Sequence, residues 1–188
     1  MKINVAISAH HIHLNKEDLE ILFGKNYELT KYKDLSQKGQ YSCVEKVKVV
    51  TLKGEMELRV LGPLRSYTQL EISKTDSIKL GINPPVRDSS CVKDSEKVTL
   101  VGPNGKIENK ECCIIANRHI HLSLDESLTY GLKNDDIVSV KVDTIKGGII
   151  SCVKVKVDKS YVHELHLDTD DGNAFLLKDG DLLEIIKD

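Results

Sequence analysis

The chain has no tryptophan, and aromatic residues make up only 4% of its 188 residues. Any hydrophobic core must therefore be built from Val, Ile and Leu. No apolar run approaches the roughly 20 residues that a membrane-spanning helix needs, and the first residues turn polar too soon for a secretory signal peptide. These absences argue against a membrane protein and indicate a soluble globular chain of one ordinary domain or two small ones.

A basic excess is also absent, because 27 Lys and Arg residues face 29 Asp and Glu residues. Proteins that bind nucleic acid usually carry such an excess, so no nucleic-acid partner is expected. The five cysteines are odd in number and two of them, Cys112 and Cys113, are adjacent, which does not fit a disulfide framework. No C-x-x-C pair exists to hold structural zinc. Inert buried thiols and a reducing cytoplasm are the expectation.

The most prominent feature that is present is an internal repeat. The segment 8–14 reads SAHHIHL, and the segment 116–122 reads ANRHIHL. Both copies follow a short apolar run, and each precedes a predicted helix with a good N-cap residue, Asn15 or Ser123. Two copies indicate duplicated halves and not a solenoid.

The rest of the chain has mostly β-type patterns. Short apolar or alternating runs are separated by glycine-containing turns; they lie at 47–52, 57–61, 97–101, 137–142 and 149–157. Many short strands with Gly-rich turns indicate barrels or sandwiches.

Each copy of the repeat contains a His-x-His pair, His11 with His13 and His119 with His121. On a strand, residues two apart point to the same face, so each pair can present two imidazoles to one metal ion. Zinc is the default metal for such nitrogen donors. The alternative is that the pairs are solvated or satisfied within the core, but two pairs in matching contexts favour metal binding.

Additional ligands and an anion-binding group are available. His166 alternates with apolar neighbours and offers a third imidazole, whereas His163 is an odd number of residues away and is predicted to lie on the surface. Glu71 offers a carboxylate, although such a residue alone more often faces solvent. Arg65 follows a strand end and a turn, where it suits bidentate binding of phosphate or carboxylate; the alternative is a surface ion pair.

These residues belong to an ordered set of motifs that spans nearly the whole chain. The set comprises residues 8–14, 33–37, 61–65, 68–71, 85–89, 117–121 and 166–174. In this order the motifs resemble those of the PduL-type phosphate propanoyltransferases, which are zinc-dependent phosphotransacylases.

The resemblance implies a mainly β fold: two β-barrels capped by short α-helices, with the active site between them. The barrels are not simple halves, because the first strand of the family joins the C-terminal part. Carried over to this chain, residues 1–9 and 117–188 form one discontinuous barrel, and residues 10–116 form the other.

The resemblance also implies the reaction, in which a short-chain acyl-CoA, propanoyl- or acetyl-CoA, and phosphate give acyl phosphate and coenzyme A, reversibly. Two zinc ions per chain are implied, one on His11, His13 and Glu71 and the other on His119, His121 and His166. Zinc would polarise the thioester, and Arg65 would hold phosphate. Family positions that contact coenzyme A correspond to Ser8, Lys33, Arg59 and Asn173.

Two departures from the family pattern stand out. His10 occupies a position that is usually Arg, although the second copy keeps Arg118, and Ser90 replaces a usual Gly after Ser89.

Members housed in microcompartments carry an N-terminal extension that this sequence lacks, so a cytoplasmic enzyme is expected, and family habit suggests a homodimer. Two other hypotheses remain: a cupin-like metalloenzyme, hydrolase or oxygenase, that uses the His-x-His pairs, and a non-enzymatic interaction protein with structural metal.

Overall fold

The computed structural model describes residues 1–186, and in that range it is mainly β, with fourteen strands and four short helices. The chain divides into two compact units. Unit 1 comprises Met1–Ala9 and Asn117–Asp188, and unit 2 comprises His10–Ala116. The last two residues of the predicted 117–188 segment lie outside the described residues. Each unit is considered separately below.

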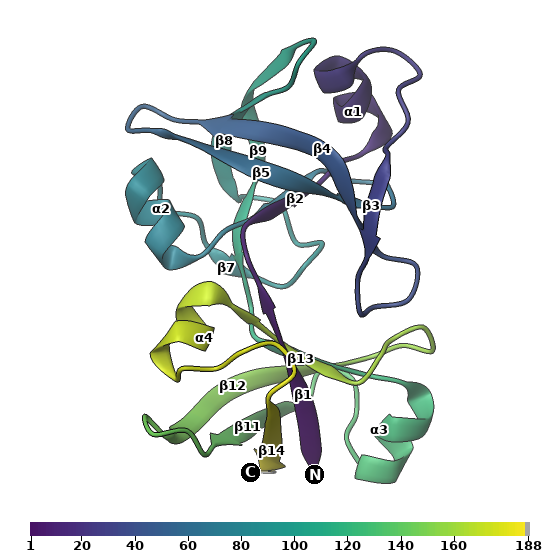
Figure 1. Ribbon diagram of the computed structural model, residues 1–188, viewed down its shortest axis with the longest axis vertical. Helices are drawn as coiled ribbons and strands as arrows, with labels where there is room; N and C mark the ends of the chain where they lie inside the picture. The colour runs from purple at the N-terminus through teal and green to yellow at the C-terminus, as the bar shows by residue number, and fades with distance from the viewer. Residues whose placement is uncertain (187–188) are drawn as a thin grey trace. The chain divides into compact units, whose positions relative to one another are not determined.

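Unit 1 is a closed six-stranded barrel with the strand order β1-β13-β10-β12-β11-β14, and β14 pairs with β1 to close it (Figure 1). Its strands are β1 (Lys2–Ser8), β10 (His119–Leu122), β11 (Ile137–Val142), β12 (Gly148–Val157), β13 (Glu164–Asp168) and β14 (Leu182–Ile186). Its helices are α3 (Leu124–Tyr130) and α4 (Thr169–Ala174).

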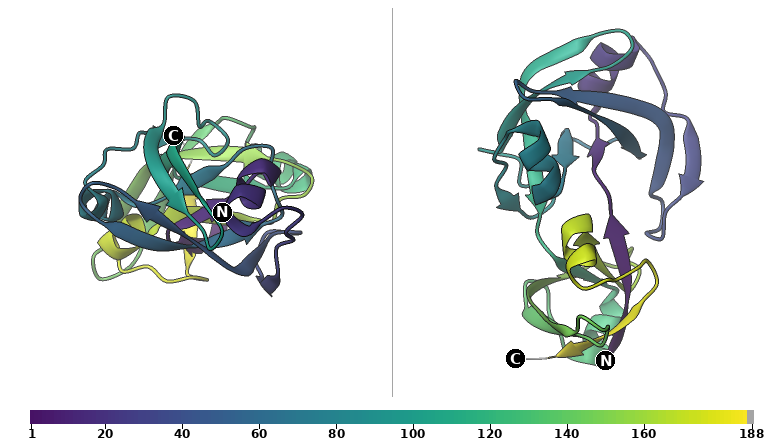
Figure 2. Two further views of the ribbon diagram at one scale, coloured as in Figure 1. Left: turned by 90° about the horizontal axis from the view of Figure 1, so that it is seen from above. Right: turned by 60° about the vertical axis from the view of Figure 1, so that its left-hand side comes forward.

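Unit 2 is a second barrel, closed by β8, which pairs with both β4 and β9. Its barrel strands are β2 (His11–His13), β4 (Tyr41–Val50), β5 (Glu55–Gly62), β6 (Gln69–Glu71), β8 (Glu96–Val101) and β9 (Lys106–Ala116), with β3 (Lys31–Asp34) and β7 (Val86–Arg87) attached. Its helices are α1 (Lys16–Phe23) and α2 (Lys74–Leu80). Figure 2 shows the strands of each unit wrapped around their own interior. The predicted mainly β fold of two barrels with short helices is confirmed.

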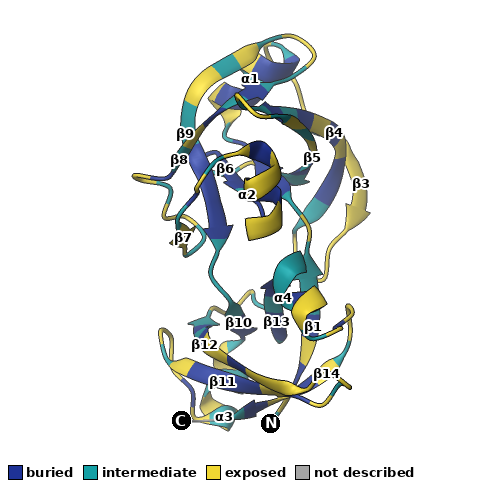
Figure 3. Cartoon of the chain, turned by 90° about the vertical axis from the view of Figure 1, so that its left-hand side faces the viewer, coloured by how far each residue is buried: buried dark blue, intermediate teal, exposed yellow. Residues whose placement is uncertain are grey.

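Each barrel encloses a separate, largely aliphatic core, visible as the buried strand segments in Figure 3. In unit 1, Ile120, Val155 and Leu165 are completely buried, and in unit 2 Ile12 and Leu70 are. Burying a side chain of this size stabilises the fold by about 1.5–3 kcal/mol. Aliphatic packing therefore replaces the aromatic residues that the sequence lacks.

The two barrels share one connectivity, which explains the internal repeat. In unit 2, β2 pairs in parallel with β5 and antiparallel with β6; in unit 1, β10 pairs in parallel with β12 and antiparallel with β13. The strand that precedes each His-x-His pair belongs to the other unit, since β1 pairs with β13 and β9 pairs with β6. The repeat is thus a duplicated barrel in which the preceding strands are exchanged.

The helices begin where the sequence predicts. The Asn15 side chain accepts a hydrogen bond from the backbone N–H of Asp18 at 2.8 Å, and Ser123 forms a reciprocal capping box with Glu126. Gly24 and Gly131 end these helices. No helix in residues 1–186 combines the length and apolar character that crossing a membrane would require.

Candidate functional sites

The strands β10 and β13 place four polar side chains on one face of unit 1. Their register pairs His119 with His166 and His121 with Glu164. Members of each pair lie opposite each other, and the pairs are two residues apart, so all four side chains point to the same side of the sheet. We call His119, His121, Glu164 and His166 the unit 1 face.

The three histidines of the unit 1 face form a candidate metal site, because one ligand atom from each lies within 4.8 Å of the other two. The His119 and His166 rings are stacked with centroids 4.9 Å apart, and the His121 and His166 centroids are 4.4 Å apart. Ligand atoms of a tetrahedral zinc ion are about 3.4 Å apart, given bonds of about 2.1 Å. Small side-chain rotations therefore suffice to close the triad around an ion.

The protonation states of His119 and His121 favour metal binding. Burial, followed by the neighbouring His166 and Lys156, lowers the pKa of His121 to about 3 and that of His119 well below its usual value. Both imidazoles are therefore neutral at pH 7 and have a free lone pair. His119 Nδ1 lies 2.8 Å from the carbonyl of Asn117, to which it donates when Nε2 serves as the ligand. His121 Nδ1 is buried with no hydrogen-bond partner among the described residues. This nitrogen is therefore available to bind a metal ion.

Two further residues hold the triad from outside. Tyr161 stacks on His121 with ring centroids 3.8 Å apart and an angle of 11° between the planes. Glu164 Oε2 lies 3.4 Å from His166 Nε2. His163, which was predicted to lie on the surface, is partly buried: its side chain is 19% exposed, and its Nδ1 lies 3.9 Å from Glu126 Oε1.

Unit 2 repeats this arrangement on β2 and β6, whose register pairs His11 with Glu71 and His13 with Gln69. His11 Nε2 lies 3.5 Å from Glu71 Oε2, and the side chain of Glu71 is only 15% exposed. The His11 and His13 ring centroids are 5.2 Å apart. We call His11, His13, Gln69 and Glu71 the unit 2 face.

His13 resembles its counterpart His121 in electrostatics. Burial lowers the pKa of His13 well below its usual value, and the charges of His11 and Arg65 lower it further. Its Nδ1 is buried with no hydrogen-bond partner among the described residues. Two imidazoles and a carboxylate form a donor set suited to zinc.

A hydrogen-bond network orders the carboxylate of Glu71. Gln69 Nε2 donates to Glu71 Oε1 at 2.5 Å and to Ser89 Oγ at 2.8 Å, and Ser89 Oγ in turn donates to Glu71 Oε1 at 3.4 Å. Gln69 Oε1 accepts the backbone N–H of Ser90 at 2.6 Å. Ser90 has φ = +84°, a conformation that favours glycine.

Arg65 lies beside the unit 2 face. Its backbone N–H donates to the carbonyl of Leu14 at 2.9 Å, and its Nη1 donates to Ser89 Oγ at 3.2 Å. Its guanidinium also lies over the Tyr67 ring, 5.8 Å from the centroid. Among residues 1–186 no carboxylate forms an ion pair with Arg65, which argues against the surface ion-pair alternative.

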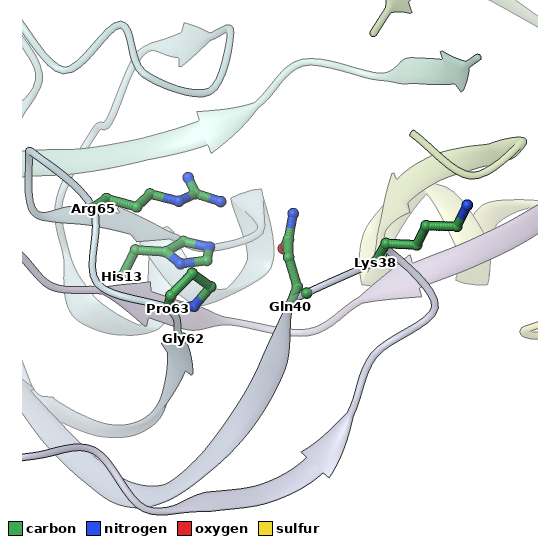
Figure 4. Close-up of a pocket in the computed structure, with 7 residues that line it drawn as sticks. His13, Lys38, Gln40, Gly62, Pro63 and Arg65 are labelled. Atoms are coloured by element: carbon green, nitrogen blue, oxygen red, sulfur yellow. The ribbon is translucent and has the colours of Figure 1, made fainter. Parts of the chain in front are cut away.

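Arg65 and His13 line a cavity of about 260 Å³. Figure 4 shows both side chains together with Lys38 and Gln40, which come from the loop between β3 and β4. The cavity is large enough for a phosphate-sized anion, and two of its lining residues are cations. It is therefore a candidate anion pocket of unit 2.

The residues expected at coenzyme A are distributed over both units. In unit 2, Arg59 Nη1 donates to the carbonyl of Cys43 at 2.6 Å and its guanidinium lies 5.2 Å from the Tyr32 ring centroid, whereas Lys33 lies on the exposed strand β3. In unit 1, Ser8 ends β1 and Asn173 lies in α4.

The cysteines do not form part of either face. All five are free thiols, and three are buried. Burial raises the pKa of Cys43 to about 11 and that of Cys112 to about 12, and it raises the pKa of Cys113 as well. The predicted burial of the adjacent pair is confirmed.

The sequence interpretation missed Gln69, Tyr161 and Glu164. Glu164 could have been found from strand alternation, because it is two residues before His166 and therefore shares its face. Nothing in the sequence pattern indicated that Tyr161 would reach His121, since Tyr161 lies in the turn that follows β12.

Comparison with known proteins gives a consistent result. The sequence model of the phosphate propanoyltransferase family matches residues 4–178. A phosphate propanoyltransferase of Thermotoga maritima is 45% identical over 187 residues, which covers 98% of this chain and 89% of that protein. One from Priestia megaterium is 49% identical over 180 residues, which covers 95% of this chain and 83% of that protein.

Proposed function

Because the chain belongs to the phosphate propanoyltransferase family and is therefore an acyltransferase, we propose that it moves a short acyl group reversibly between coenzyme A and phosphate. Phosphate attacks the thioester carbonyl, the carbon–sulfur bond breaks, and acyl phosphate and the thiol of coenzyme A are released. Propanoyl and acetyl groups are the proposed acyl chains. The near full-length similarity to enzymes of this name carries the proposal, and it favours acyl transfer over a cupin-like hydrolase or oxygenase.

The donor sets of the two faces support zinc binding. The proposed ligands are His119, His121 and His166 in unit 1. In unit 2 the proposed ligands are His11, His13 and Glu71. Zinc, when bound, supplies Lewis-acid polarisation of a carbonyl and affinity for a thiolate.

Arg65 is the proposed phosphate clamp. Its guanidinium is oriented by Ser89 and the Tyr67 ring, it has no carboxylate partner in residues 1–186, and it borders the anion pocket. A planar two-donor cation holds a phosphate in one orientation and stabilises the negative charge that develops as it attacks. Ser89 therefore has a positioning role.

Ser8, Lys33, Arg59 and Asn173 are the proposed coenzyme A contacts. The cations at Lys33 and Arg59 suit the phosphates of that molecule. Arg59 in particular is held by the Cys43 carbonyl and the Tyr32 ring, so little of its conformational freedom would be lost on binding.

A phosphate-dependent thiol-release assay with acetyl-, propanoyl- and butanoyl-CoA tests the proposed reaction. We expect free thiol and acyl phosphate in equal amounts only when phosphate is present, with the highest kcat/KM for one of the two shorter chains. Thiol release at the same rate without phosphate would instead indicate a thioester hydrolase.

Elemental analysis of the purified chain tests the metal content, with about two zinc ions per chain expected. His121→Ala should lose one of them and His13→Ala the other.

We further propose a cytoplasmic homodimer, to be tested by cell fractionation and by light scattering of the purified protein.

A further inference from the structure

Each face has four positions, two on each of its two strands, which we call its corners. The unit 1 face and the unit 2 face each contain a single carboxylate, but at different corners. In unit 2 the carboxylate is Glu71, directly opposite His11. In unit 1 the residue at the matching corner is His166, and the carboxylate is Glu164, which lies opposite His121. The corner that Glu164 occupies is filled in unit 2 by the neutral Gln69.

Glu164 is placed to act on His166. Its Oε2 lies 3.4 Å from His166 Nε2, and only 11% of its side chain is exposed. This distance exceeds that of a normal hydrogen bond, and Glu164 does not belong to the set of atoms that lie within 4.8 Å of one another. Glu164 therefore lies beside the histidine triad and is not part of it.

The charge of Glu164 matters because histidine binds a metal ion as the neutral imidazole and so supplies no negative charge. A divalent cation held by three neutral imidazoles would bring two positive charges into a partly buried place where water screens poorly. Glu71 supplies a compensating negative charge in unit 2. In unit 1 only Glu164 among the four residues of the face can supply it.

We infer that Glu164 is a positioning residue of the unit 1 metal centre, which orients His166 and neutralises part of the charge of the bound cation. Carboxylates in contact with metal-ligating histidines commonly have this role, and their loss typically weakens metal binding 10- to 100-fold. Gln69 has a different function at the same corner, because its amide hydrogen-bonds to Glu71 and Ser89. The inference rests on the zinc binding proposed above.

The test measures zinc affinity of the full-length chain with a competing chromophoric chelator. A His11→Ala background removes the unit 2 site, so that only the unit 1 site is titrated. We expect Glu164→Gln, which keeps the shape and removes the charge, to weaken zinc binding at least about tenfold. Glu164→Asp, which keeps the charge, should recover part of the loss. Glu184→Gln, on the exposed side of β14, is the matched control and should bind zinc like the background chain.

Cobalt(II) provides a second readout, because its visible absorption reports the coordination geometry. Glu164→Gln should change the spectrum of the unit 1 site, and Glu184→Gln should not. Equal zinc affinity and unchanged spectra in Glu164→Gln would overturn the inference and leave the proposed zinc sites intact. No zinc binding by the wild-type chain would overturn the proposed sites themselves. If Glu164→Gln fails to fold, as judged by circular dichroism, the Asp variant decides: affinity that falls as much as after loss of a ligand histidine contradicts a role for the charge.

Discussion

His10 and Arg118 occupy corresponding places in the repeat, and each pairs with an aspartate in the first turn of a helix. His10 Nδ1 lies 3.0 Å from Asp76 Oδ2, whereas Arg118 makes two hydrogen bonds to Asp171, at 2.9 and 2.6 Å. Burial pushes the pKa of Asp76 upward, but the hydrogen bonds from His10 and Lys79 outweigh it and hold the pKa below its usual value. Histidine at position 10 thus keeps the contact with the helix aspartate. It lacks the second hydrogen bond that arginine makes at the corresponding place in the other unit.

This comparison predicts opposite effects for a reciprocal pair of variants. His10→Arg should raise the free energy of unfolding by up to about 1 kcal/mol, and Arg118→His should lower it by a similar amount, the range for partly exposed ion pairs. Urea unfolding followed by circular dichroism measures both. A loss of stability in His10→Arg would show that the site is shaped for an imidazole.

The proposed role of Arg65 as a phosphate clamp leads to a specific prediction for catalysis. If Arg65 is the proposed phosphate clamp, Arg65→Ala should lose activity on the order of a hundredfold or more, because a charge-stabilising group is removed. Lysine should rescue poorly, since a point charge does not reproduce the two-donor fork. Steady-state kinetics with phosphate as the varied substrate measures the effect, with Lys97→Ala on β8 as the control. Near-wild-type turnover would refute the clamp.

The stacking of Tyr161 on His121 predicts that two substitutions of Tyr161 will differ in their effect on zinc affinity. Tyr161→Phe keeps the ring that stacks on His121, so zinc affinity of unit 1 should stay close to wild type. Tyr161→Ala removes the ring and should weaken zinc binding several-fold, because His121 gains freedom that binding must then restrict. Titration with a competing chelator compares them. Equal loss in both variants would point to the hydroxyl instead of the stack.

At the scale of elements, α3 depends on its cap more than the other helices do. None of its residues is buried, so packing contributes little, whereas Ser123 and Glu126 form a complete capping box. The hydrogen bonds from Ser123 lower the pKa of Glu126 although burial acts in the opposite direction. The helix is therefore held mainly at its N-terminus.

Removing that cap should destabilise α3 selectively. Ser123→Ala is expected to cost about 1 kcal/mol of stability, the usual magnitude for a lost N-cap side chain. Hydrogen exchange of the α3 amides should rise more than that of the β11 amides, which lie within the barrel. Uniform acceleration in both elements would indicate a global effect and contradict a local one.

Strand register is the element-level feature that builds both faces. On β10 and β13 a slip by one residue would point His166 away from His119, because side chains alternate between faces. The buried residues Ile120 and Leu165, which lie opposite each other on the other side of these strands, resist such a slip. Core packing and site geometry thus depend on the same pairing.

For the whole molecule, the buried histidines make stability depend on pH. Burial lowers the pKa of His13, His119 and His121 below the usual 6.5. Between their folded and unfolded pKa values the unfolded chain binds more protons, so stability falls as the pH drops below about 6.5. Each such histidine contributes up to about 1.4 kcal/mol per pH unit.

We therefore expect the metal-free protein to lose stability between pH 7.5 and pH 5.5. Urea unfolding in the presence of a chelator measures this change, and His121→Ala should make the dependence on pH shallower. A free energy of unfolding that is constant across this range would show that the histidines are protonated as readily in the folded chain as in the unfolded one.

Much about this protein could be predicted from residues alone. The aliphatic core, the two capped helices and the β-rich pattern follow from local composition and periodicity, which act over a few neighbours. The pairs His11 with His13 and His119 with His121 were visible because two side chains on the same face of one strand are two residues apart. The ordered motifs then indicated the family.

The tertiary structure decided how distant residues meet. His119 and His166 are far apart in sequence, and only the pairing of β10 with β13 places them on one face. The same holds for Glu164 beside His166, for Tyr161 on His121 and for Ser89 between Arg65 and Glu71. Strand periodicity shows which way a side chain points but not which strand lies next to it, because long-range pairing depends on how the whole barrel closes around its core.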